Sequence, residues 1–189
     1  MTGDLYRRIR NTLRFLLGAL DGFTKDEGVF ANDGWDLKDG GTLKDLPELE
    51  QLVLHQLYEM DKKVRKHIEN YEFNKLAKLL HDYCNEELSA FYFDIRKDRL
   101  YCDDPAWIER RAYRTVLDTL FHALVRYAAP VLVFTAEEVW TTRFPDAPSI
   151  HLQKIEPLPD QWLDEALATR FAALRTLRED VTEAIEPLR

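Results

Sequence analysis

The chain has 189 residues, of which 46% are hydrophobic and 12% aromatic, so it can bury a core and is not expected to be disordered. Its net charge of −8 argues against a general nucleic-acid binder. Two cysteines, Cys84 and Cys102, are too few for a four-thiolate zinc site. No apolar run approaches the length of a membrane span, and arginines interrupt the first apolar segment, which argues against a signal peptide. A soluble, cytoplasmic protein with no membrane partner is therefore expected.

The charge is unevenly distributed along the chain, which weakens the objection to a polyanionic partner. Residues 1–20 carry four arginines against one aspartate, and residues 61–81 carry six basic residues against three acidic ones. Residues 21–60, in contrast, carry three lysines against ten acidic residues. Local patches, rather than the total charge, set the field at a binding face.

The first predicted element is a helix over residues 4–20. Its apolar residues recur every three or four positions, at Leu5, Ile9, Leu13, Leu16 and Leu20. Asp21-Gly22 is expected to end it. Residues 21–46 hold five of the seven glycines and are predicted to be a long acidic connection.

The second helix is predicted to start near Pro47, a residue suited to a first helical turn. A third helix is predicted from Glu72 toward Phe93, followed by a bend over residues 96–104. Asp104-Pro105 is a helix-start signal for the fourth helix, whose apolar face is so wide that this helix should be the most buried.

The fourth helix is expected to end or kink at Pro130. The sequence Thr135 to Glu138 has the form of a capping box and predicts a short helix through Trp140. Residues 144–161 are predicted to be a proline-containing connector, with a short extended piece over residues 149–155, and a last helix runs over about 162–185.

The elements together predict an all-α fold, an up-and-down helix bundle with a long connection after its first helix and a trailing C-terminal helix. We divide the chain into a bundle (1–143), a connector (144–161) and a C-terminal helix (162–189).

No complete active site is evident, and we predict no catalytic or metal-binding residue. His81-Asp82 could belong to a metal-dependent phosphohydrolase, with His55 or His67 and Asp118 completing the set, but a dipeptide is weak evidence. His122 is expected to be a hydrogen-bonded packing residue, and Glu137 and Glu138 to serve capping. The four tryptophans are expected to pack in the core or between helices.

The segment from Leu88 to Cys102, LSAFYFDIRKDRLYC, interleaves aromatic and basic residues. Such a mixture is typical of surfaces that hold unstacked bases and their phosphates. By its chemistry alone the segment is a modest hint of nucleic-acid binding.

Four strings resemble the anticodon-binding domain of isoleucyl-tRNA synthetases, in that family's order. They are RIRNTLRFLL (8–17), LSAFYFDIRKDRLY (88–101), the APVL and FTAEEVW strings (129–140) and SIHL (149–152). The resemblance covers about residues 5–155 and is closest to bacterial-type isoleucyl enzymes among the class I aminoacyl-tRNA synthetases.

The resemblance implies a module that binds the anticodon stem-loop of the isoleucine tRNA in translation. The parent ligase activates isoleucine with ATP and Mg²⁺ and charges that tRNA, and a C-terminal zinc module is common in bacterial members. The HIGH and KMSKS signatures of the catalytic domain do not occur here. The resemblance therefore implies a fragment that is not catalytic by itself, with no cofactor of its own, and whose partners are the tRNA and the catalytic domain.

The predicted tRNA-binding residues are chosen from the basic patches, because phosphate contacts from Lys and Arg fix the register of a bound RNA. They are Arg7, Arg10, Arg14, Lys75, Arg96, Lys97, Arg99, Arg110, Arg111 and Arg114. The charges over residues 96–114 have an alternative, internal role, in which they pair with Asp94, Asp98, Asp103, Asp104 and Glu109. A helical protein-interaction module without nucleic acid is the alternative function that the net charge favours.

Overall fold

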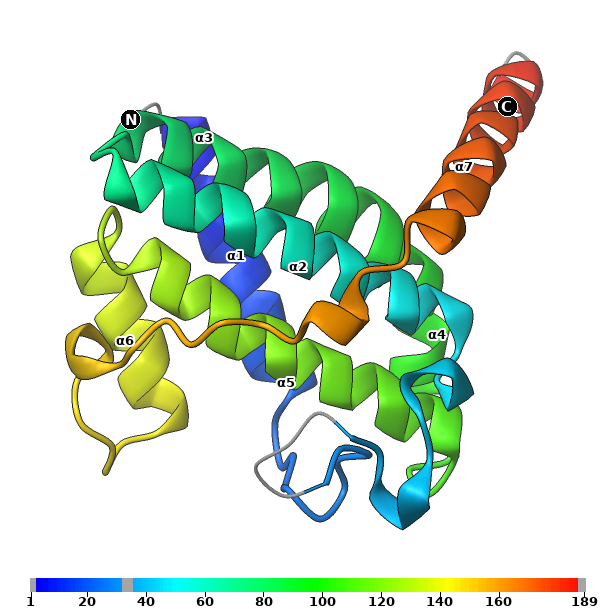
Figure 1. Cartoon of the computed structure of the whole chain (residues 1–189), viewed down its shortest axis with the longest axis horizontal. Coiled ribbons are helices and arrows are strands. Elements are labelled where there is room, and N and C mark those ends of the chain that lie inside the picture. The colour runs from blue at the N-terminus through cyan, green and yellow to red at the C-terminus, as the bar shows by residue number, and fades with distance from the viewer. Residues whose placement is uncertain (1–2, 32–35, 187–189) are drawn as a thin grey trace.

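The computed structural model describes residues 3–31 and 36–186. Within them the regular elements are helices, and the one strand-like contact is an isolated bridge between Phe30 and Leu37. The long elements are α1 (Gly3–Ala19), α2 (Glu48–Glu69), α3 (Phe73–Asp82), η3 (Tyr83–Phe93), α4 (Asp94–Tyr101), α5 (Ile108–Ala128), α6 (Val133–Arg143) and α7 (Glu165–Ile185). The prediction of an all-α bundle is confirmed (Figure 1).

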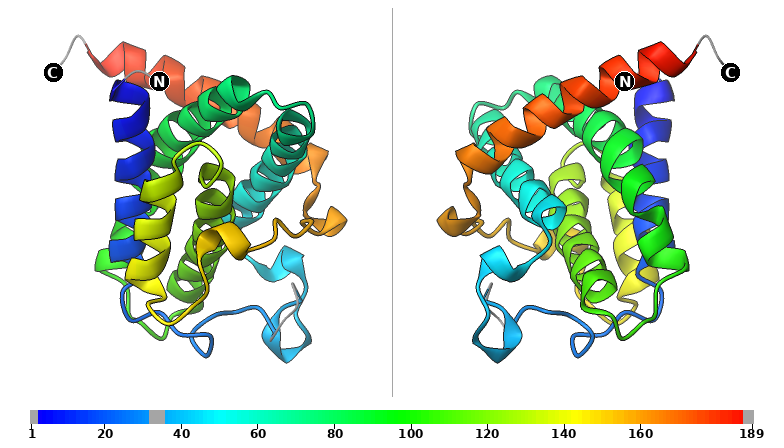
Figure 2. Two further views of the ribbon diagram at one scale, coloured as in Figure 1. Left: turned by 90° about the vertical axis from the view of Figure 1, so that its left-hand side faces the viewer. Right: turned by 90° about the vertical axis from the view of Figure 1, so that its right-hand side faces the viewer.

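Helix α5 occupies the centre of the bundle. It packs against α1, α2, α3, α4 and α6, and these five helices surround it (Figures 1 and 2). Tyr113, Leu117 and Leu120 are fully buried, and buried residues cover every side of the middle turns of α5 except the stripe of Asp118, His122 and Arg126, which is partly buried. The expectation that this helix is the most buried is therefore confirmed.

Several helix boundaries follow the predicted stop and start signals. Gly22 has φ +67°, a left-handed conformation that glycine adopts without steric cost, and it follows the end of α1. Pro47 immediately precedes α2, and Pro130 lies two residues beyond the last residue of α5.

The bend predicted over residues 96–104 begins later than expected, because the chain leaves the helix only after Tyr101 and turns over residues 102–107. Helices α3, η3 and α4 form one continuous rod from residue 73 to residue 101, and η3 has the wider turns of a π-helix. Three successive aromatic residues in η3 are all buried against different neighbours: Phe91 lies under the Arg175 guanidinium, Tyr92 meets Tyr113 edge-on, and Phe93 stacks on Phe15. An α-helix at the surface buries only one stripe of side chains and would leave one of three successive residues exposed. The wider turns of η3 coincide with the burial of all three.

Two residues that were predicted to cap the start of a helix, Asp104 and Thr135, do not cap it in the structure. Asp104 caps a turn, its carboxylate accepting from the Ala106 amide at 2.8 Å, and α5 begins only at Ile108. Helix α6 begins at Val133, so Thr135 lies inside the first turn and cannot form the predicted capping box. The Glu137 carboxylate instead accepts from the Ser149 hydroxyl and the Ile150 amide, at 2.8 and 3.0 Å.

The connector crosses α5 without a regular strand (Figure 1). The predicted extended piece over residues 149–155 contains a 3₁₀ turn, η4 (Ile150–Leu152), and a second turn, η5 (Asp160–Trp162), follows. Ile150 and Trp162 are buried in the bundle core. Helix α7 then projects from the bundle, and the division of the chain at residues 143 and 161 stays a prediction.

Among the described residues, none of the helices is both long and apolar enough to cross a membrane.

Candidate nucleic-acid interface

An arginine stripe runs along the outer face of α1. Arg7, Arg10 and Arg14 are exposed, and within the described residues no carboxylate lies in ion-pair distance of them. The neighbouring Arg8 differs, because its guanidinium binds Asp4 at 3.0 Å and also contacts Asn85. An unpaired arginine stripe is suited to phosphate groups spaced along an RNA strand.

The turn between α4 and α5 exposes two aromatic side chains. Tyr101 is 72% and Trp107 is 54% exposed, on either side of this turn. The expectation that Trp107 packs in the core or between helices is wrong, because this residue lies before the first turn of α5, with an extended backbone at φ −66°, ψ 135°. Trp140 and Trp162 are buried as expected, whereas Trp35 lies outside the described residues. Exposed aromatic rings beside basic side chains are typical of sites where unstacked nucleobases bind.

Three of the predicted basic residues take part in local ion pairs at the surface. Lys97 pairs with Asp94 at 3.2 Å, Arg99 with Asp103 at 2.8 Å, and Lys75 with Glu72 at 2.5 Å. The predicted internal pairing with Asp94 and Asp103 is therefore present. The Lys97 and Lys75 pairs are exposed, and such pairs contribute only about 0–1 kcal/mol, so a phosphate can replace the carboxylate at little cost; the Arg99–Asp103 pair is partly buried and is held more firmly.

Arg96, in contrast, is committed to the core. Its Nε and Nη2 donate to the two carboxylate oxygens of Glu50 at 2.8 and 2.6 Å, from α4 across to α2. The Glu50 side chain is 1% exposed, and burial raises its pKa despite the adjacent guanidinium. Arg96 therefore compensates a buried charge and is poorly placed to exchange partners.

The bases of α5 hold the long connection against the bundle. Arg114 binds both carboxylate oxygens of Glu27 at 2.7 Å and donates to the backbone carbonyls of Ala19 and Asp21. Arg111 donates to the Glu27 carbonyl at 2.9 Å, and an Arg110 nitrogen lies 3.8 Å from the same carboxylate. Sequence reasoning missed Glu27 and Glu50 as partners, because each lies more than 40 residues from the base it binds.

The histidines proposed for a phosphohydrolase have separate surroundings. Lys78 and His81 both contact Asp82, whose pKa they lower, whereas His67 contacts Glu72. His55 is buried and accepts a hydrogen bond from the Asp164 amide at 3.0 Å. In the part of the chain that the structure describes, no three His, Cys, Asp or Glu side chains are grouped to hold a metal ion.

Comparison with known proteins bears directly on this all-α bundle. Residues 50–189 match the family model described as the anticodon-binding domain of tRNA ligase. The chain belongs to this family. The matched region of this anticodon-binding domain contains the α4–α5 turn and every described helix from α3 to α7.

Individual relatives are isoleucine–tRNA ligases. That of Zymomonas mobilis is 52% identical over 100% of this chain and 19% of the relative. Those of Gluconobacter oxydans and Agrobacterium fabrum are 46% and 45% identical over 99% and 97% of the chain, each covering 18% of the relative. The anticodon-binding domain thus spans about one fifth of the length of the ligases that it matches, and the resemblance noted in the sequence is confirmed.

Proposed function

We propose that this chain is the module of an isoleucine–tRNA ligase that binds the anticodon stem-loop of the isoleucine tRNA. The observation that carries the proposal is the match of nearly the whole chain to isoleucine–tRNA ligases. The parent enzyme would be cytoplasmic, activating isoleucine with ATP and Mg²⁺ in a catalytic domain outside this chain. That domain is the second proposed partner, and any zinc module would also lie elsewhere in the parent.

The arginine stripe of α1 is proposed to bind the RNA backbone. No described carboxylate lies within ion-pair distance of Arg7, Arg10 or Arg14. Each guanidinium can therefore neutralise a phosphate and release counterions without losing an existing partner. Near the loop, Lys97 can exchange its surface carboxylate for phosphate, as can Lys75 on the third helix, and Arg99 can do so at a greater cost. Arg96 and the three arginines of α5 are instead proposed to stabilise the fold and to make no contact with RNA.

Tyr101 and Trp107 are proposed to stack on bases of the single-stranded loop. Their exposed rings lie at a turn whose ends are fixed by helices α4 and α5, so little ordering is needed on binding. Stacking of this kind contributes about 1–3 kcal/mol per base.

A salt titration with an isoleucine anticodon stem-loop tests the proposal. Replacing Arg7, Arg10 and Arg14 by Gln should reduce the slope of log K against log[salt] by about 2–3, because three phosphate contacts are lost. Lys62, Lys63 and Lys66 on α2 provide a matched control, since their replacement by Gln removes the same charge from another exposed face.

The Tyr101→Ala and Trp107→Ala variants should lower affinity while the salt slope stays unchanged. An equal loss of stem-loop affinity in the α1 and α2 triple variants would show that the arginine stripe acts only through its general charge, and would contradict a specific role in RNA binding. No binding of the wild-type chain at low salt would contradict the function itself and favour a protein-interaction module.

A further inference from the structure

Apolar side chains are exposed where helix α6 begins. Phe134, in the first turn of α6, is 90% exposed, and the neighbouring Val133 is 47% exposed. Leu152, the last residue of η4, is 75% exposed, and Tyr6 on α1 is 38% exposed. An apolar side chain stabilises a fold only when its surface is removed from water. Phe134 and Leu152 therefore contribute little to the stability of the bundle.

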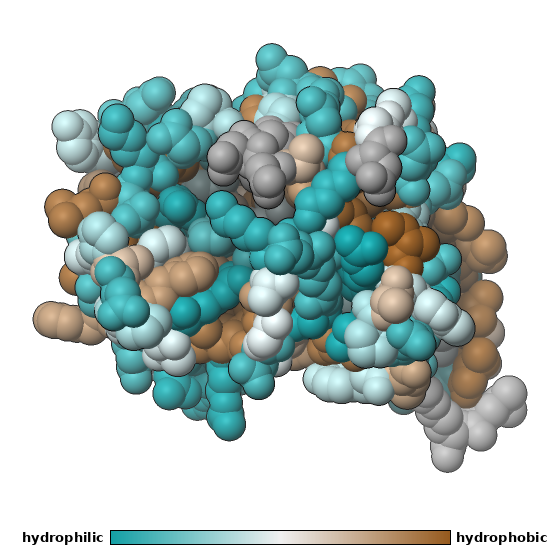
Figure 3. All heavy atoms as spheres, turned by 90° about the horizontal axis from the view of Figure 1, so that it is seen from below, coloured by the Kyte–Doolittle hydropathy of each residue, from teal (hydrophilic) through white to brown (hydrophobic). Residues whose placement is uncertain are grey.

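Neighbouring elements bring these side chains onto one surface. Nε2 of His151, the residue before Leu152, lies 3.3 Å from the Val133 carbonyl oxygen. On α1, the Tyr6 hydroxyl lies 3.2 Å from Oγ1 of Thr135. Both η4 and α1 thus adjoin the first turn of α6, and apolar side chains protrude at this end of the molecule, at the left edge of Figure 3. We define the α6 patch as Tyr6, Val133, Phe134 and Leu152.

The composition of the α6 patch suits an apolar protein surface better than a phosphate. None of its side chains is charged. Its one polar side-chain atom, the Tyr6 hydroxyl oxygen, already has Thr135 within hydrogen-bond distance. Contiguous exposed apolar side chains on a soluble domain are typical of surfaces that another protein surface covers. The patch is therefore suited to a partner that buries it by hydrophobic contact.

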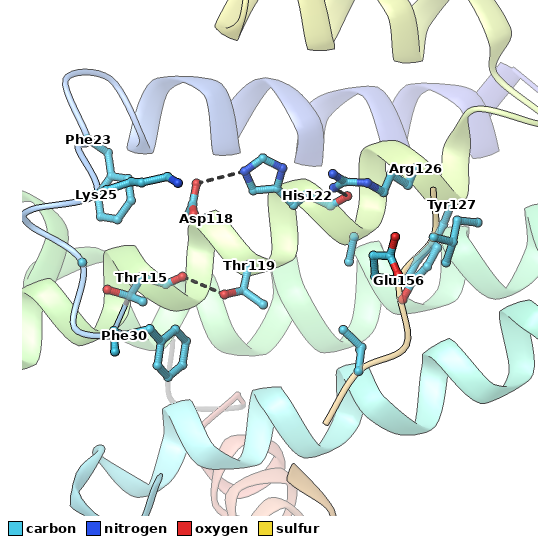
Figure 4. A pocket seen from close by; sticks show the side chains of 15 residues that line it. Phe23, Lys25, Phe30, Thr115, Asp118, Thr119, His122, Arg126, Tyr127 and Glu156 are labelled. Carbon is cyan, nitrogen blue, oxygen red and sulfur yellow. Dashed lines mark hydrogen bonds and ion pairs between the residues drawn. The ribbon is translucent and has the colours of Figure 1, made fainter. Parts of the chain in front are cut away.

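The cavity of about 540 Å³ beside α5 differs from the patch, because its polar groups already have partners within the bundle. The Thr119 hydroxyl donates to the Thr115 carbonyl oxygen at 3.0 Å, and Asp118 pairs with Arg143. The His122 ring faces Asp118 and packs on aromatic neighbours (Figure 4). These groups serve the bundle itself, whereas the side chains of the α6 patch point to an external partner.

The α6 patch lies at the opposite end of the bundle from the α4–α5 turn. Helix α5 begins at this turn and ends next to the start of α6 (Figure 1). Near the turn, Arg114 donates to the carbonyls of Ala19 and Asp21, which holds the C-terminal end of α1 there. Helix α1 therefore carries the arginine stripe from the turn back to Tyr6. An RNA stem that leaves the turn and follows the stripe extends toward the patch.

We propose that the α6 patch is the surface on which the catalytic domain of the parent ligase docks, an inference that rests on the proposed function. The chain covers 18–19% of its relatives, so most of the ligase lies outside it and can cover the patch. The catalytic domain charges the end of the tRNA that is remote from the anticodon, and the stripe directs the stem toward the patch. Docking there sets the distance between the anticodon loop and the catalytic site. Because both domains belong to one polypeptide, a small apolar contact is sufficient.

Hydroxyl-radical footprinting, in which side chains are oxidised according to their exposure, tests the surface without tRNA. Phe134 should be oxidised about tenfold more slowly in the full-length ligase than in the 189-residue chain, because its exposure falls from 90% to that of an interface core. Leu152 should be protected as well. Ile95 and Leu163, each 41% exposed on other elements, are matched internal controls and should react at similar rates in both proteins.

Cross-linking identifies what covers the patch. In the full-length ligase, Phe134 is replaced by the photoreactive residue p-benzoylphenylalanine, and the irradiated protein is digested and analysed by mass spectrometry. The cross-linked peptide should come from the domain that carries the HIGH and KMSKS signatures. A cross-link to a second copy of the ligase, or to a region outside that domain, would overturn the proposal.

Binding of the anticodon stem-loop separates the docking surface from RNA contacts. In the 189-residue chain, Phe134→Ser combined with Leu152→Ser should leave stem-loop affinity unchanged, with circular dichroism verifying the fold. A loss of about tenfold, as expected for a lost base stack, would assign the patch to RNA and overturn the proposal. Equal oxidation of Phe134 in the chain and in the ligase would overturn it and leave the proposed function intact. Protection of Phe134 in the ligase, without stem-loop binding by the chain, would support the docking surface and contradict the proposed function.

Discussion

Removing Arg96 should destabilise the protein strongly without weakening RNA binding by the folded chain. In Arg96→Met the Glu50 carboxylate stays buried, and the Tyr92 hydroxyl, 3.4 Å away, is the one other described side chain that donates to it. Breaking a buried pair by removing one partner costs about 3–5 kcal/mol. For a chain of this size each kcal/mol corresponds to about 2–4 °C, so the melting temperature should fall by roughly 6–20 °C.

The effect should also depend on pH. Loss of the guanidinium raises the folded-state pKa of Glu50 further above its unfolded value, so the folded state binds the proton more tightly. The variant should therefore be most stable, relative to wild type, below the unfolded pKa, and should lose stability as the pH rises through the folded pKa. Urea denaturation followed by circular dichroism at pH 4.5 and pH 7.5 measures this difference.

Two further variants make the test specific. Glu50→Gln combined with Arg96→Met should recover most of the loss at pH 7.5, because no uncompensated charge is left in the core. Lys97→Met, at an exposed pair one residue along, should change stability by less than about 1 kcal/mol. An Arg96→Met protein of wild-type stability but with weak stem-loop affinity would refute the reasoning and return Arg96 to the RNA interface.

Three other outcomes can be measured independently. Arg114→Ala should speed amide hydrogen exchange in the segment around Glu27, because it removes the bidentate clamp on the connection; unchanged exchange there would contradict the clamp. Cys102 is exposed whereas burial raises the pKa of Cys84 to about 12, so one thiol should react with a disulfide reagent at pH 8 and two after denaturation, and two fast thiols in the native protein would be inconsistent with the structure. The folded pKa of His122 is lowered to about 4, so the unfolded state takes up its proton first and stability should decrease as pH falls from 6.5 toward 4; His122→Gln should flatten that dependence in thermal melts.

Local signals in the sequence predicted the elements better than their connections. Glycine at position 22 and proline at positions 47 and 130 marked helix ends correctly, because their backbone restrictions act within one or two residues. The bend expected from Arg96 begins only after Tyr101, and Arg96 lies within α4, where it binds the distant carboxylate of Glu50. Tertiary contacts of this kind leave no periodic trace in one sequence.

The sequence predicted that a nucleic-acid interface exists, but it identified only some of the residues that form the candidate interface. The arginines of α1 were recognised from the basic patch over residues 1–20, and in the structure they are exposed. Trp107 was missed, because its exposure depends on where α5 begins, which is a difference of a few residues. The bases of α5 could not be assigned from sequence, since their partner Glu27 belongs to a connection with no regular pattern.

The π-helical turns of η3 set the rotational phase between α3 and α4. Each residue of an α-helix turns the chain by about 100°, so a deletion of one residue between Tyr83 and Phe93 would rotate Arg96 away from Glu50 while both flanking helices could still form. Among related chains, changes of length in this segment should therefore be accompanied by changes at the partners of Arg96. The number of residues in η3 therefore determines how α4 is rotated about its axis relative to α3.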